Sequence, residues 1–341
     1  MTKLKNCKIA VVGATGNVGR SMLSILAERG VPLSNVQAVA SDRSVGKEVS
    51  YGEEGVLIAS ALNTFDFSKV DVALFSPGGK ISAEFAPKAA ARGCVVIDNT
   101  SHFRMDPDVP LIIPEVNASA IADFTKRHII ANPNCSTIQM LVALKPLHDL
   151  ASIKRVVLST YQSVSGAGKA AMDELHDQTR AIFMNGSIKA QSLPHPIVFN
   201  VIPQIGDFRE DGSTAEEWKM MEETQKILSP DIKVSATCVR VPVFIGHAVA
   251  AVVEFEKQLL PVKARQALRQ APGVVVVDDP GELHYAMPID CVGEDPVYVS
   301  RIRQDTSVAY GLNLWIVADN VRKGAALNAI QIAEILAKDY L

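Results

Sequence analysis

The sequence lacks the features that mark membrane proteins and nucleic-acid-binding proteins. It contains no apolar run approaching the roughly 18 residues that a membrane-spanning helix needs. Its 34 basic and 37 acidic residues give a net charge of −3, and only 6% of residues are aromatic. Neither a basic surface nor a series of stacking rings is therefore expected, and we expect no nucleic-acid or membrane partner.

Cysteines are few, and their spacing shows no pairing pattern. The chain has 5 of them, widely spaced and without a C-x-x-C motif. This usage indicates a reducing compartment and suggests neither a disulfide framework nor a zinc site. The histidines and carboxylates also lack metal-ligand spacing. The segment Met1–Lys8 has no cleavage-like sequence after it and does not resemble a signal peptide, so we expect a cytoplasmic protein without a metal.

A chain of 341 residues is long enough for two domains. In the first 135 residues short apolar segments alternate with helical patterns, which predicts βαβ units and a Rossmann-like α/β domain with a parallel sheet. The expected strands are Lys8–Val12, Asn35–Ala40, Asp71–Phe75, Cys94–Ile97 and His128–Ala131, and the expected helices are Asn17–Arg29, residues 83–92 and Ile138–Leu147.

The second half predicts a different architecture, an α+β domain with a mixed or antiparallel sheet. Its expected strands are 154–162, 234–241, 248–256, 274–278, 297–303 and 311–318, and its expected helices are 169–184, 215–227 and 261–270. A last helix, 323–338, is expected to return to the first domain. We therefore expect a nucleotide-binding domain at 1–134 with 320–341, and a catalytic and dimerisation domain at 135–319.

A glycine-rich loop follows the first expected strand and opens the first expected helix. Gly13-Ala14-Thr15-Gly16-Asn17-Val18-Gly19 is a G-x-x-G-x-x-G variant of the dinucleotide fingerprint. Small residues let the backbone approach a pyrophosphate, and the helix N-terminus offers free N–H groups. A structural tight turn is the alternative. The expected cofactor contacts here are Gly13, Thr15, Gly16, Asn17 and Val18.

The end of the second strand bears on the choice of cofactor. Asp42 is the residue type that takes the ribose 2′-hydroxyl of NAD, whereas Arg43 between Ser41 and Ser44 suits the 2′-phosphate of NADP. We favour NADP, with Asp42 leaving the strictness of that preference open. Ser76 ends another strand, where α/β ligands bind, although a plain turn explains this segment nearly as well.

Cys135 is the candidate nucleophile. It follows an apolar strand in Asn132-Pro133-Asn134-Cys135 and stands at the start of a helix, where the helix dipole favours the thiolate. The neighbouring N–H groups suit an oxyanion. A buried, inert cysteine is the alternative, and we accept it for Cys7, Cys94, Cys238 and Cys291. A thiol after a nucleotide domain indicates hydride transfer at the aldehyde or acyl level.

The chain resembles the bacterial aspartate-semialdehyde dehydrogenase family in motifs that span nearly its whole length. The stretches that carry the resemblance are Val12–Gly19, Asp98–Ser101 through Arg104, Pro114–Asn117, Asn132–Cys135, Ser159–Gly168, Glu216–Lys219, Arg240–Val243 through Gly246-His247, and Lys323–Asn328. The resemblance implies NADPH-dependent conversion of β-aspartyl phosphate to aspartate semialdehyde and phosphate, a step toward diaminopimelate, lysine, methionine and threonine. It also implies a homodimer or homotetramer.

The resemblance also implies the roles of individual residues. Cys135 carries the acyl thioester, His247 relays protons, Asn134 orients the thioester carbonyl and Gln162 orients the substrate or thioester. Arg240, a charge within an apolar strand, needs a partner such as a substrate carboxylate or a structural acid. The remaining roles are phosphate binding by Arg104 and Lys219, substrate contact by Glu216, and the nicotinamide border for Ser165, Gly166 and Asn320.

Four other kinds of protein compete with this interpretation. N-acetylglutamyl-phosphate reductase runs the same chemistry on a longer acyl phosphate, but it usually shows a Pro-Gly-Cys-Tyr-like run where this chain has Pro133-Asn134-Cys135-Ser136. A glyceraldehyde-3-phosphate type enzyme has no use for an arginine directed at a carboxylate. A non-catalytic NADP-binding regulatory protein would not need Cys135, Gln162, Arg240 and His247 together, and a purely structural oligomerisation module would use only the sheet of the second domain.

Overall fold

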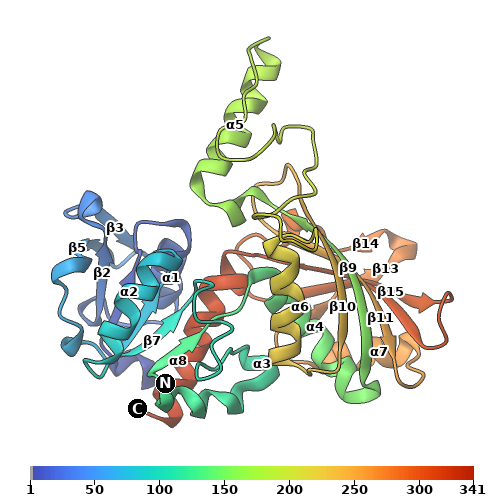
Figure 1. The fold of residues 1–341 in the computed structure, drawn as a ribbon, viewed down its shortest axis with the longest axis horizontal. Coiled ribbons are helices and arrows are strands. Elements are labelled where there is room, and N and C mark those ends of the chain that lie inside the picture. Colours follow the sequence, from blue (N-terminus) through green and yellow to red (C-terminus); the bar gives the residue numbers. More distant parts are fainter. Residues whose placement is uncertain (1–2) are drawn as a thin grey trace. The chain divides into compact units, whose positions relative to one another are not determined.

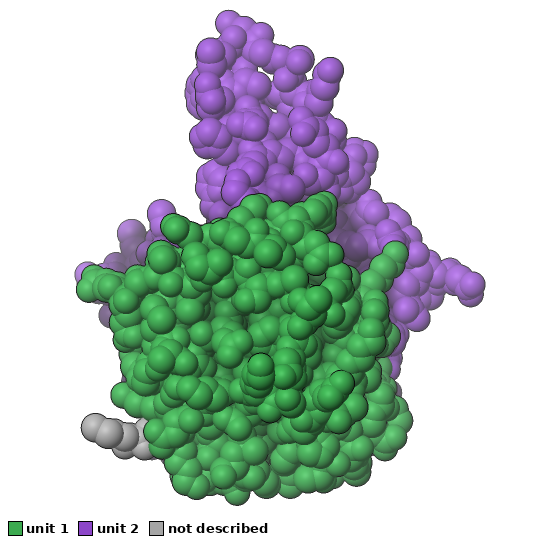
Figure 2. Space-filling view, turned by 90° about the vertical axis from the view of Figure 1, so that its left-hand side faces the viewer, with its two compact units in different colours: residues 1–134, 325–341 green, residues 135–324 purple. Residues whose placement is uncertain are grey.

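The computed structural model describes residues 3–341, which form two compact units. The first unit comprises residues 1–134 and 325–341, and the second comprises residues 135–324 (Figure 2). Among the described residues no helix has the length and apolar character needed to cross a membrane.

The first unit is built on a six-stranded parallel sheet, as the alternation of strands and helices predicts. The strand order is β5-β2-β1-β6-β7-β8, and every neighbouring pair is parallel. All four positions of β1 are buried, which explains its uninterrupted apolar sequence. The strands are β1 (Ile9–Val12), β2 (Val36–Ala40), β5 (Ser60–Ala61), β6 (Val72–Phe75), β7 (Val95–Asp98) and β8 (Ile129–Ala131).

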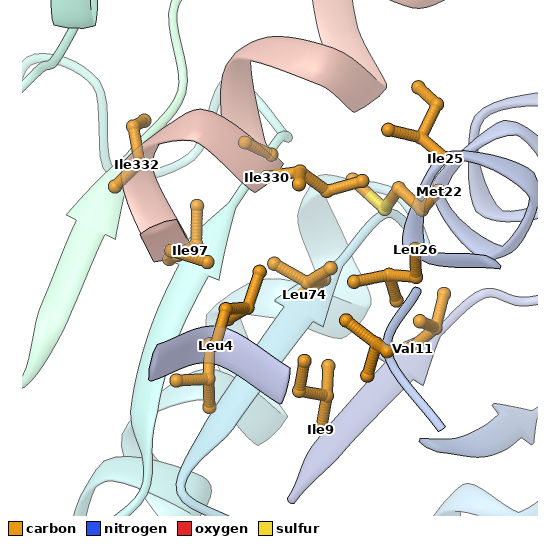
Figure 3. Close-up of a cluster of buried hydrophobic side chains, with 14 of the residues drawn as sticks. Leu4, Ile9, Val11, Met22, Ile25, Leu26, Leu74, Ile97, Ile330 and Ile332 are labelled. Atoms are coloured by element: carbon orange, nitrogen blue, oxygen red, sulfur yellow. The ribbon is translucent and has the colours of Figure 1, made fainter. Parts of the chain in front are cut away.

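Helices from both ends of the chain share the core of this unit. Figure 3 shows Met22 and Leu26 of α1 (Asn17–Glu28) and Ile330 of α8 (Leu327–Asp339) pointing toward Leu74 and Ile97 of the sheet. The C-terminal helix is therefore an integral part of the first unit. The unit also contains α2 (Gly79–Ala90), α3 (Pro114–Asn117) and a small antiparallel pair, β3 (Glu48–Tyr51) and β4 (Gly55–Ile58), which the sequence pattern did not predict.

The second unit contains a six-stranded mixed sheet of order β10-β9-β11-β16-β15-β12. The outer pairs β10/β9 and β12/β15 are parallel and the inner pairs are antiparallel, so the expected mixed sheet is confirmed. The strands are β9 (Ile153–Gln162), β10 (Lys233–Arg240), β11 (His247–Phe255), β12 (Val274–Val276), β15 (Val297–Asp305) and β16 (Gly311–Ala318), with a separate small pair, β13 (Asp278–Asp279) and β14 (His284–Tyr285).

Three helices pack on the sheet of the second unit. The central one, α4 (Cys135–Ala151), contacts β9, β11, β15 and β16 as well as α6 (Ala215–Ile227) and α7 (Pro261–Gln270). The fourth helix, α5 (Lys169–Phe183), projects away from the sheet (Figure 1). Because α4 is buried on most sides, the residues at its first turn are held firmly against the sheet.

Three helix starts differ from the sequence pattern. The helix expected at residues 83–92 is α2, which begins four residues earlier, at Gly79. The helix expected from Ile138 begins three residues earlier, at Cys135 itself. The last helix, expected from Lys323, begins as a π-helical turn at Arg322–Ala326 and becomes α-helical only at Leu327. Over so few residues the apolar spacing of a π-helical turn cannot be distinguished from that of an α-helix, so periodicity does not reveal it.

Candidate functional site

The glycine-rich loop has the close backbone packing that its sequence predicts. Gly13 has a φ of 87°, and a Cβ there would lie 2.7 Å from the main-chain oxygen of Ser76. A Cβ on Gly19 would lie 2.3 Å from the main-chain oxygen of Gly13. Only glycine fits either position. The contact joins the ends of β1 and β6, where the strand order of the sheet reverses and α/β proteins bind ligands.

The N-terminus of α1 is open to an anion supplied from outside the chain. Its N-cap residue, Gly16, has no side chain with which to cap the helix, and its first turn contains no acidic residue. Thr15, Asn17 and Val18 are partly exposed around it. Uncapped N–H groups at the positive end of the helix dipole suit a pyrophosphate.

The residues after β2 separate the two possible cofactors. The carboxylate of Asp42 accepts a hydrogen bond of 2.8 Å from the amide of Asn63. Arg43 is exposed, between exposed Ser41 and partly exposed Ser44, and no described side chain pairs with its guanidinium. The acid therefore has a partner within the chain, while the guanidinium stays open to a phosphate. This arrangement fits NADP.

Cys135 differs from the other cysteines in its environment. It is partly exposed as the first residue of α4, whereas the other four are buried. Burial raises the pKa of the thiols of Cys94, Cys238 and Cys291 to about 12, and it also raises the pKa of Cys7. Thiols with raised pKa values in apolar surroundings are inert. Cys135, the cysteine that the sequence singles out, is thus the partly exposed one, and its role as the nucleophile remains a prediction.

His247 is fully buried, and it lies one residue before the strand expected at 248–256. Gly246, with a φ of 97°, makes the turn, and His247 is the first residue of β11. Its Nδ1 accepts a hydrogen bond of 3.1 Å from the main-chain N–H of Ser163. Its Nε2 has no partner among the described residues. Burial and the charge of Arg240 lower the pKa of this imidazole to about 3, so the ring is neutral at pH 7.

Arg240 and His247 converge on the backbone of Gly166. A Cβ on Gly166 would lie 3.0 Å from both Nη1 of Arg240 and Nε2 of His247. Arg240 is the last residue of β10 and not, as the sequence pattern suggests, inside a strand. Its Nη1 donates a hydrogen bond of 2.8 Å to the main-chain oxygen of Ser163. Burial lowers its pKa, while Glu216 and Cys135 act in the opposite direction, so the thiol lies within electrostatic reach of this guanidinium.

A second group of polar side chains joins the start of α4 to α6. The amide nitrogen of Gln162 donates hydrogen bonds to the hydroxyl of Ser136, the residue after Cys135, and, at 3.1 Å, to the carboxylate of Glu216. The carboxylate of Glu216 also accepts a hydrogen bond of 3.1 Å from Lys219. Pairs spaced i,i+3 are common on solvated helix faces. Glu216 is buried, so its pair with Lys219 is not of that kind. The structure therefore brings Gln162, Glu216 and Lys219 together beside the nucleophile.

Two further residues lie close to Cys135 in the chain or in space, and the sequence pattern had not singled them out. Gln139, one helical turn after Cys135, is buried and donates 3.1 Å to the main-chain oxygen of His247. A Cβ on Gly324 would lie 2.8 Å from the Cβ of Cys135. A polar residue four positions after the nucleophile is a signal for the first of these. The second depends on a π-helical turn that periodicity does not detect.

Asn320 faces the polar side chains around His247. It is buried, and its oxygen accepts hydrogen bonds from the hydroxyls of Ser163 and Ser165 and from the main-chain N–H of Gly246, at 2.9–3.2 Å. Its role beside a nicotinamide, like those of Ser165 and Gly166, remains a prediction. The observed contacts connect it to the residue before His247.

Arg104 and Asn134 belong to the first unit. Arg104 is buried and donates hydrogen bonds to the main-chain oxygens of Asn132, at 2.9 Å, and of Asn99, at 3.0 Å. It therefore supports the segment that leads to Cys135. Asn134 is buried directly before the nucleophile. The phosphate role of Arg104 and the orienting role of Asn134 remain predictions.

A nucleotide-type parallel sheet followed by a cysteine at a helix start, with a buried imidazole and guanidinium in the same unit, defines a thiol-dependent dehydrogenase class. Known families agree with this class. The family model described as "Semialdehyde dehydrogenase, NAD binding domain" matches residues 8–124, and the one described as "Semialdehyde dehydrogenase, dimerisation domain" matches residues 144–323.

Individual relatives are more specific. The aspartate-semialdehyde dehydrogenase of Aquifex aeolicus is 53% identical over 98% of this chain and 99% of its own length. That of Rickettsia conorii is 52% identical over both full lengths. Crystal structures of aspartate semialdehyde dehydrogenase II from Vibrio cholerae, one of them complexed with ASA, align with a TM-score of 0.95 at 49–50% identity over 98% of this chain and 99% of theirs. The chain belongs to the aspartate-semialdehyde dehydrogenase family.

Proposed function

We propose that this protein catalyses the reversible, NADPH-dependent reductive dephosphorylation of L-aspartyl-4-phosphate to L-aspartate 4-semialdehyde. The observation that carries the proposal is the placement of Cys135 at the start of α4, within electrostatic reach of Arg240. Relatives at about half identity over full length carry the name of this activity, which favours it over N-acetylglutamyl-phosphate reductase. The product would feed synthesis of diaminopimelate, lysine, methionine and threonine.

Cys135 is the proposed nucleophile of the first step. Its thiolate attacks the acyl carbon, a C–S bond forms, and the bond from that carbon to the phosphate oxygen breaks, which releases inorganic phosphate. The first-turn N–H groups of α4 would stabilise the oxyanion of this step. Asn134, directly before the nucleophile, and Gln162, fixed by Ser136 and Glu216, would hold the acyl group in place.

His247 and Arg240 act on the two ends of the substrate. Nε2 of the imidazole would take the thiol proton and return it to the oxygen of the hemithioacetal that forms on Cys135. Arg240 would bind the α-carboxylate of the substrate, because its charge is buried and one edge of its guanidinium is already fixed on Ser163. Glu216, which raises the pKa of Arg240, would contact the same end of the substrate.

Lys219 and Arg104 are the proposed phosphate ligands. Lys219 is partly exposed and is held by Glu216 at 3.1 Å, so its position is set without being enclosed. A compact cation suits the transient binding of a leaving phosphate.

The cofactor residues of this chain fit NADP. When bound, the nicotinamide supplies the hydride that reduces the thioester carbon. We assign the pyrophosphate to the loop Gly13–Val18 and the 2′-phosphate to Arg43. Ser76, Ser41 and Ser44, at the ends of their strands, are proposed as further cofactor contacts. The open N-terminus of α1 and the unpaired Arg43 support this assignment. Ser165, Gly166 and Asn320 are proposed for the nicotinamide.

We also propose a homodimer or homotetramer in the cytoplasm. The second unit matches a family model described as a dimerisation domain. Its sheet carries a hollow of about 380 Å³ whose lining combines aliphatic and aromatic side chains, Trp315 among them, with the polar side chains of Arg301, Arg303 and Asn313. The five cysteines, all within the described residues, form no disulfide and four of them are buried, which suits a reducing compartment. Light scattering on the purified protein tests the oligomer, and a monomer at micromolar concentration would contradict it.

Phosphate-dependent reduction of NADP by aspartate semialdehyde tests the main proposal. We expect activity with this aldehyde and little with N-acetylglutamate semialdehyde, the product of the competing reductase. Cys135→Ala should abolish turnover while NADP binding, measured by calorimetry, persists. Unchanged turnover in the variant would contradict the thiol mechanism. Binding without any turnover in the wild type would favour a regulatory protein.

A further inference from the structure

Two main-chain oxygens hold the guanidinium of Arg104, one of the proposed phosphate ligands. Nε of Arg104 donates a hydrogen bond of 2.9 Å to the oxygen of Asn132, and Nη2 donates one of 3.0 Å to the oxygen of Asn99. Two such bonds fix both the plane and the direction of a planar guanidinium. Neither acceptor carries a charge, so these bonds orient the cation without neutralising it. The orientation of Arg104 therefore depends on the spacing of the two carbonyls.

The two carbonyls stand at the ends of neighbouring parallel strands. Asn99 directly follows β7, and Asn132 directly follows β8. The main-chain N–H of Asn132 donates a hydrogen bond of 2.8 Å to the main-chain oxygen of Asp98, which continues the pairing of the two strands. The sheet thus brings both carbonyls to the edge where its parallel strands end, and the chain leaves the sheet after each of them.

The side chains of the same two asparagines bind each other. The amide nitrogen of Asn132 donates a hydrogen bond of 2.6 Å to the amide oxygen of Asn99. We call these two residues, joined by this bond, the asparagine clasp. Each of them is tied to the other by its side chain and to Arg104 by its main-chain oxygen. The clasp therefore sets the spacing of the two carbonyls that orient the guanidinium.

Asn328, on α8, orients the amide of Asn132 within the clasp. The amide nitrogen of Asn328 donates hydrogen bonds to the main-chain oxygen of Ile112, at 3.0 Å, and to the amide oxygen of Asn132, at 2.7 Å. A main-chain oxygen can only accept, so Ile112 fixes the amide of Asn328, and Asn328 in turn fixes that of Asn132. Asn132 and Asn328 are both 0% exposed, so bulk water does not compete for these bonds.

We propose that Asn132 and Asn328 are positioning residues that hold the guanidinium of Arg104, through the asparagine clasp, in the orientation that binds phosphate. The inference rests on the proposed function, since it concerns the phosphate that the reaction releases or consumes. A mobile arginine loses side-chain entropy when it binds a ligand, whereas a guanidinium fixed in advance loses less. The C-terminal helix thereby serves phosphate binding as well as the core of the first unit.

The test is a double-mutant cycle on the KM for inorganic phosphate in the phosphate-dependent reduction of NADP by aspartate semialdehyde. Asn328→Leu replaces the amide by an apolar side chain of similar size and so releases the amide of Asn132. We expect the KM for phosphate to rise about fivefold to tenfold, while the KM values for the aldehyde and for NADP stay within about twofold.

Arg104→Gln supplies the second side of the cycle. Alone, it should raise the KM for phosphate at least as much as Asn328→Leu does. Added to Arg104→Gln, the substitution Asn328→Leu should change this KM by less than about twofold, because a positioning residue has no further effect once the group that it positions is gone. A merely structural role for Asn328 would give the same rise in both backgrounds.

Asn35→Leu is the matched control. Asn35 belongs to the same unit, and its amide donates a hydrogen bond of 2.8 Å to the main-chain oxygen of Lys5. It directly precedes β2, at the edge of the parallel sheet opposite to the clasp. Its substitution should lower the Tm and leave the KM for phosphate unchanged.

An unchanged KM for phosphate in either single variant would overturn the inference, as would equal rises in the KM values of all three substrates. A rise of the same size in both backgrounds would also overturn it. If either variant fails to fold, Asn99→Ala and Arg104→Lys take their places, because Asn99 is only half-buried and lysine keeps the charge. An active wild-type enzyme with these negative results would refute this inference alone, whereas a wild type without phosphate-dependent activity would refute the proposed function.

Discussion

The side-chain amide of Gln139 donates a hydrogen bond of 3.1 Å to the main-chain oxygen of His247. Gln139 stands one helical turn after Cys135, so the same face of α4 presents the proposed nucleophile and contacts the strand residue proposed as the base. Both partners are buried. The relative position of thiol and imidazole is thus set by a helix and a strand and does not depend on a loop.

Gln139→Leu should lower kcat about fivefold and change the KM values little. It removes a buried hydrogen bond worth about 1 kcal/mol, which is about a factor of five in rate if the bond serves alignment. The oxygen of Gln139 already lacks a partner, so a leucine of similar size leaves no new buried polar atom on that side chain. Steady-state kinetics with a thermal unfolding curve would check this. A lower Tm with unchanged kcat would mean that the bond is structural only.

Gly324→Ala should impair the chemical step because the new methyl group would lie 2.8 Å from the Cβ of Cys135. The start of α4 must then shift, and misplacement of a nucleophile by a fraction of an ångström is costly. We expect a loss of roughly tenfold to hundredfold in kcat. Gly281→Ala is the control, since its methyl group would meet an ordinary contact at 3.5 Å. Equal kcat in the two variants would refute this account of Gly324.

Arg43→Gln should raise the KM for NADP by roughly tenfold to hundredfold, the loss expected for one charge-assisted hydrogen bond to phosphate. The KM for NAD should change little, because NAD lacks the 2′-phosphate. Parallel titration of both cofactors measures the difference. An equal change for both cofactors would place Arg43 elsewhere, and a wild-type preference for NAD would instead favour Asp42 as the cofactor ligand.

The depressed pKa of His247 predicts a pH-dependent stability. Its folded pKa of about 3 lies below its ordinary value of 6.5, so between these values the unfolded chain binds a proton that the folded chain does not. Stability is therefore lost as the pH falls from 6.5 toward 3. From pH 6.5 to pH 5 the loss is about 2 kcal/mol. Urea unfolding at the two pH values, at one protein concentration, should show a smaller loss in His247→Gln. Equal losses would contradict the burial of a neutral imidazole.

The sequence predicts the fold well where periodicity is strong. The ends of β16 (Gly311–Ala318) and α6 (Ala215–Ile227) are those expected, because turn residues bound both segments. The sequence pattern fails for elements that are short or irregular, such as the π-helical turn before α8 and the short pair β3/β4. The mixed pairing of the second sheet follows from alternating character, while its strand order depends on tertiary contacts that spacing does not encode.

For the site, residue type was informative only where a motif or a burial conflict singled a residue out. Cys135 and Arg240 are examples, since a thiol at a helix start and a charge among apolar residues each need an explanation. Ser163 gave no such signal, because a serine after a strand is ordinary, and the only signal for Gln139 is its place one helical turn after Cys135. Their importance depends on three-dimensional contacts with His247.

The central claim, that Cys135 carries the acyl group, is tested most directly by mass spectrometry of the protein incubated with aspartate semialdehyde and NADP in the absence of phosphate. The account predicts an aspartyl adduct on the peptide that holds Cys135, formed with NADPH and discharged by added phosphate. An adduct on another residue, or phosphate-dependent turnover in Cys135→Ala, would contradict it.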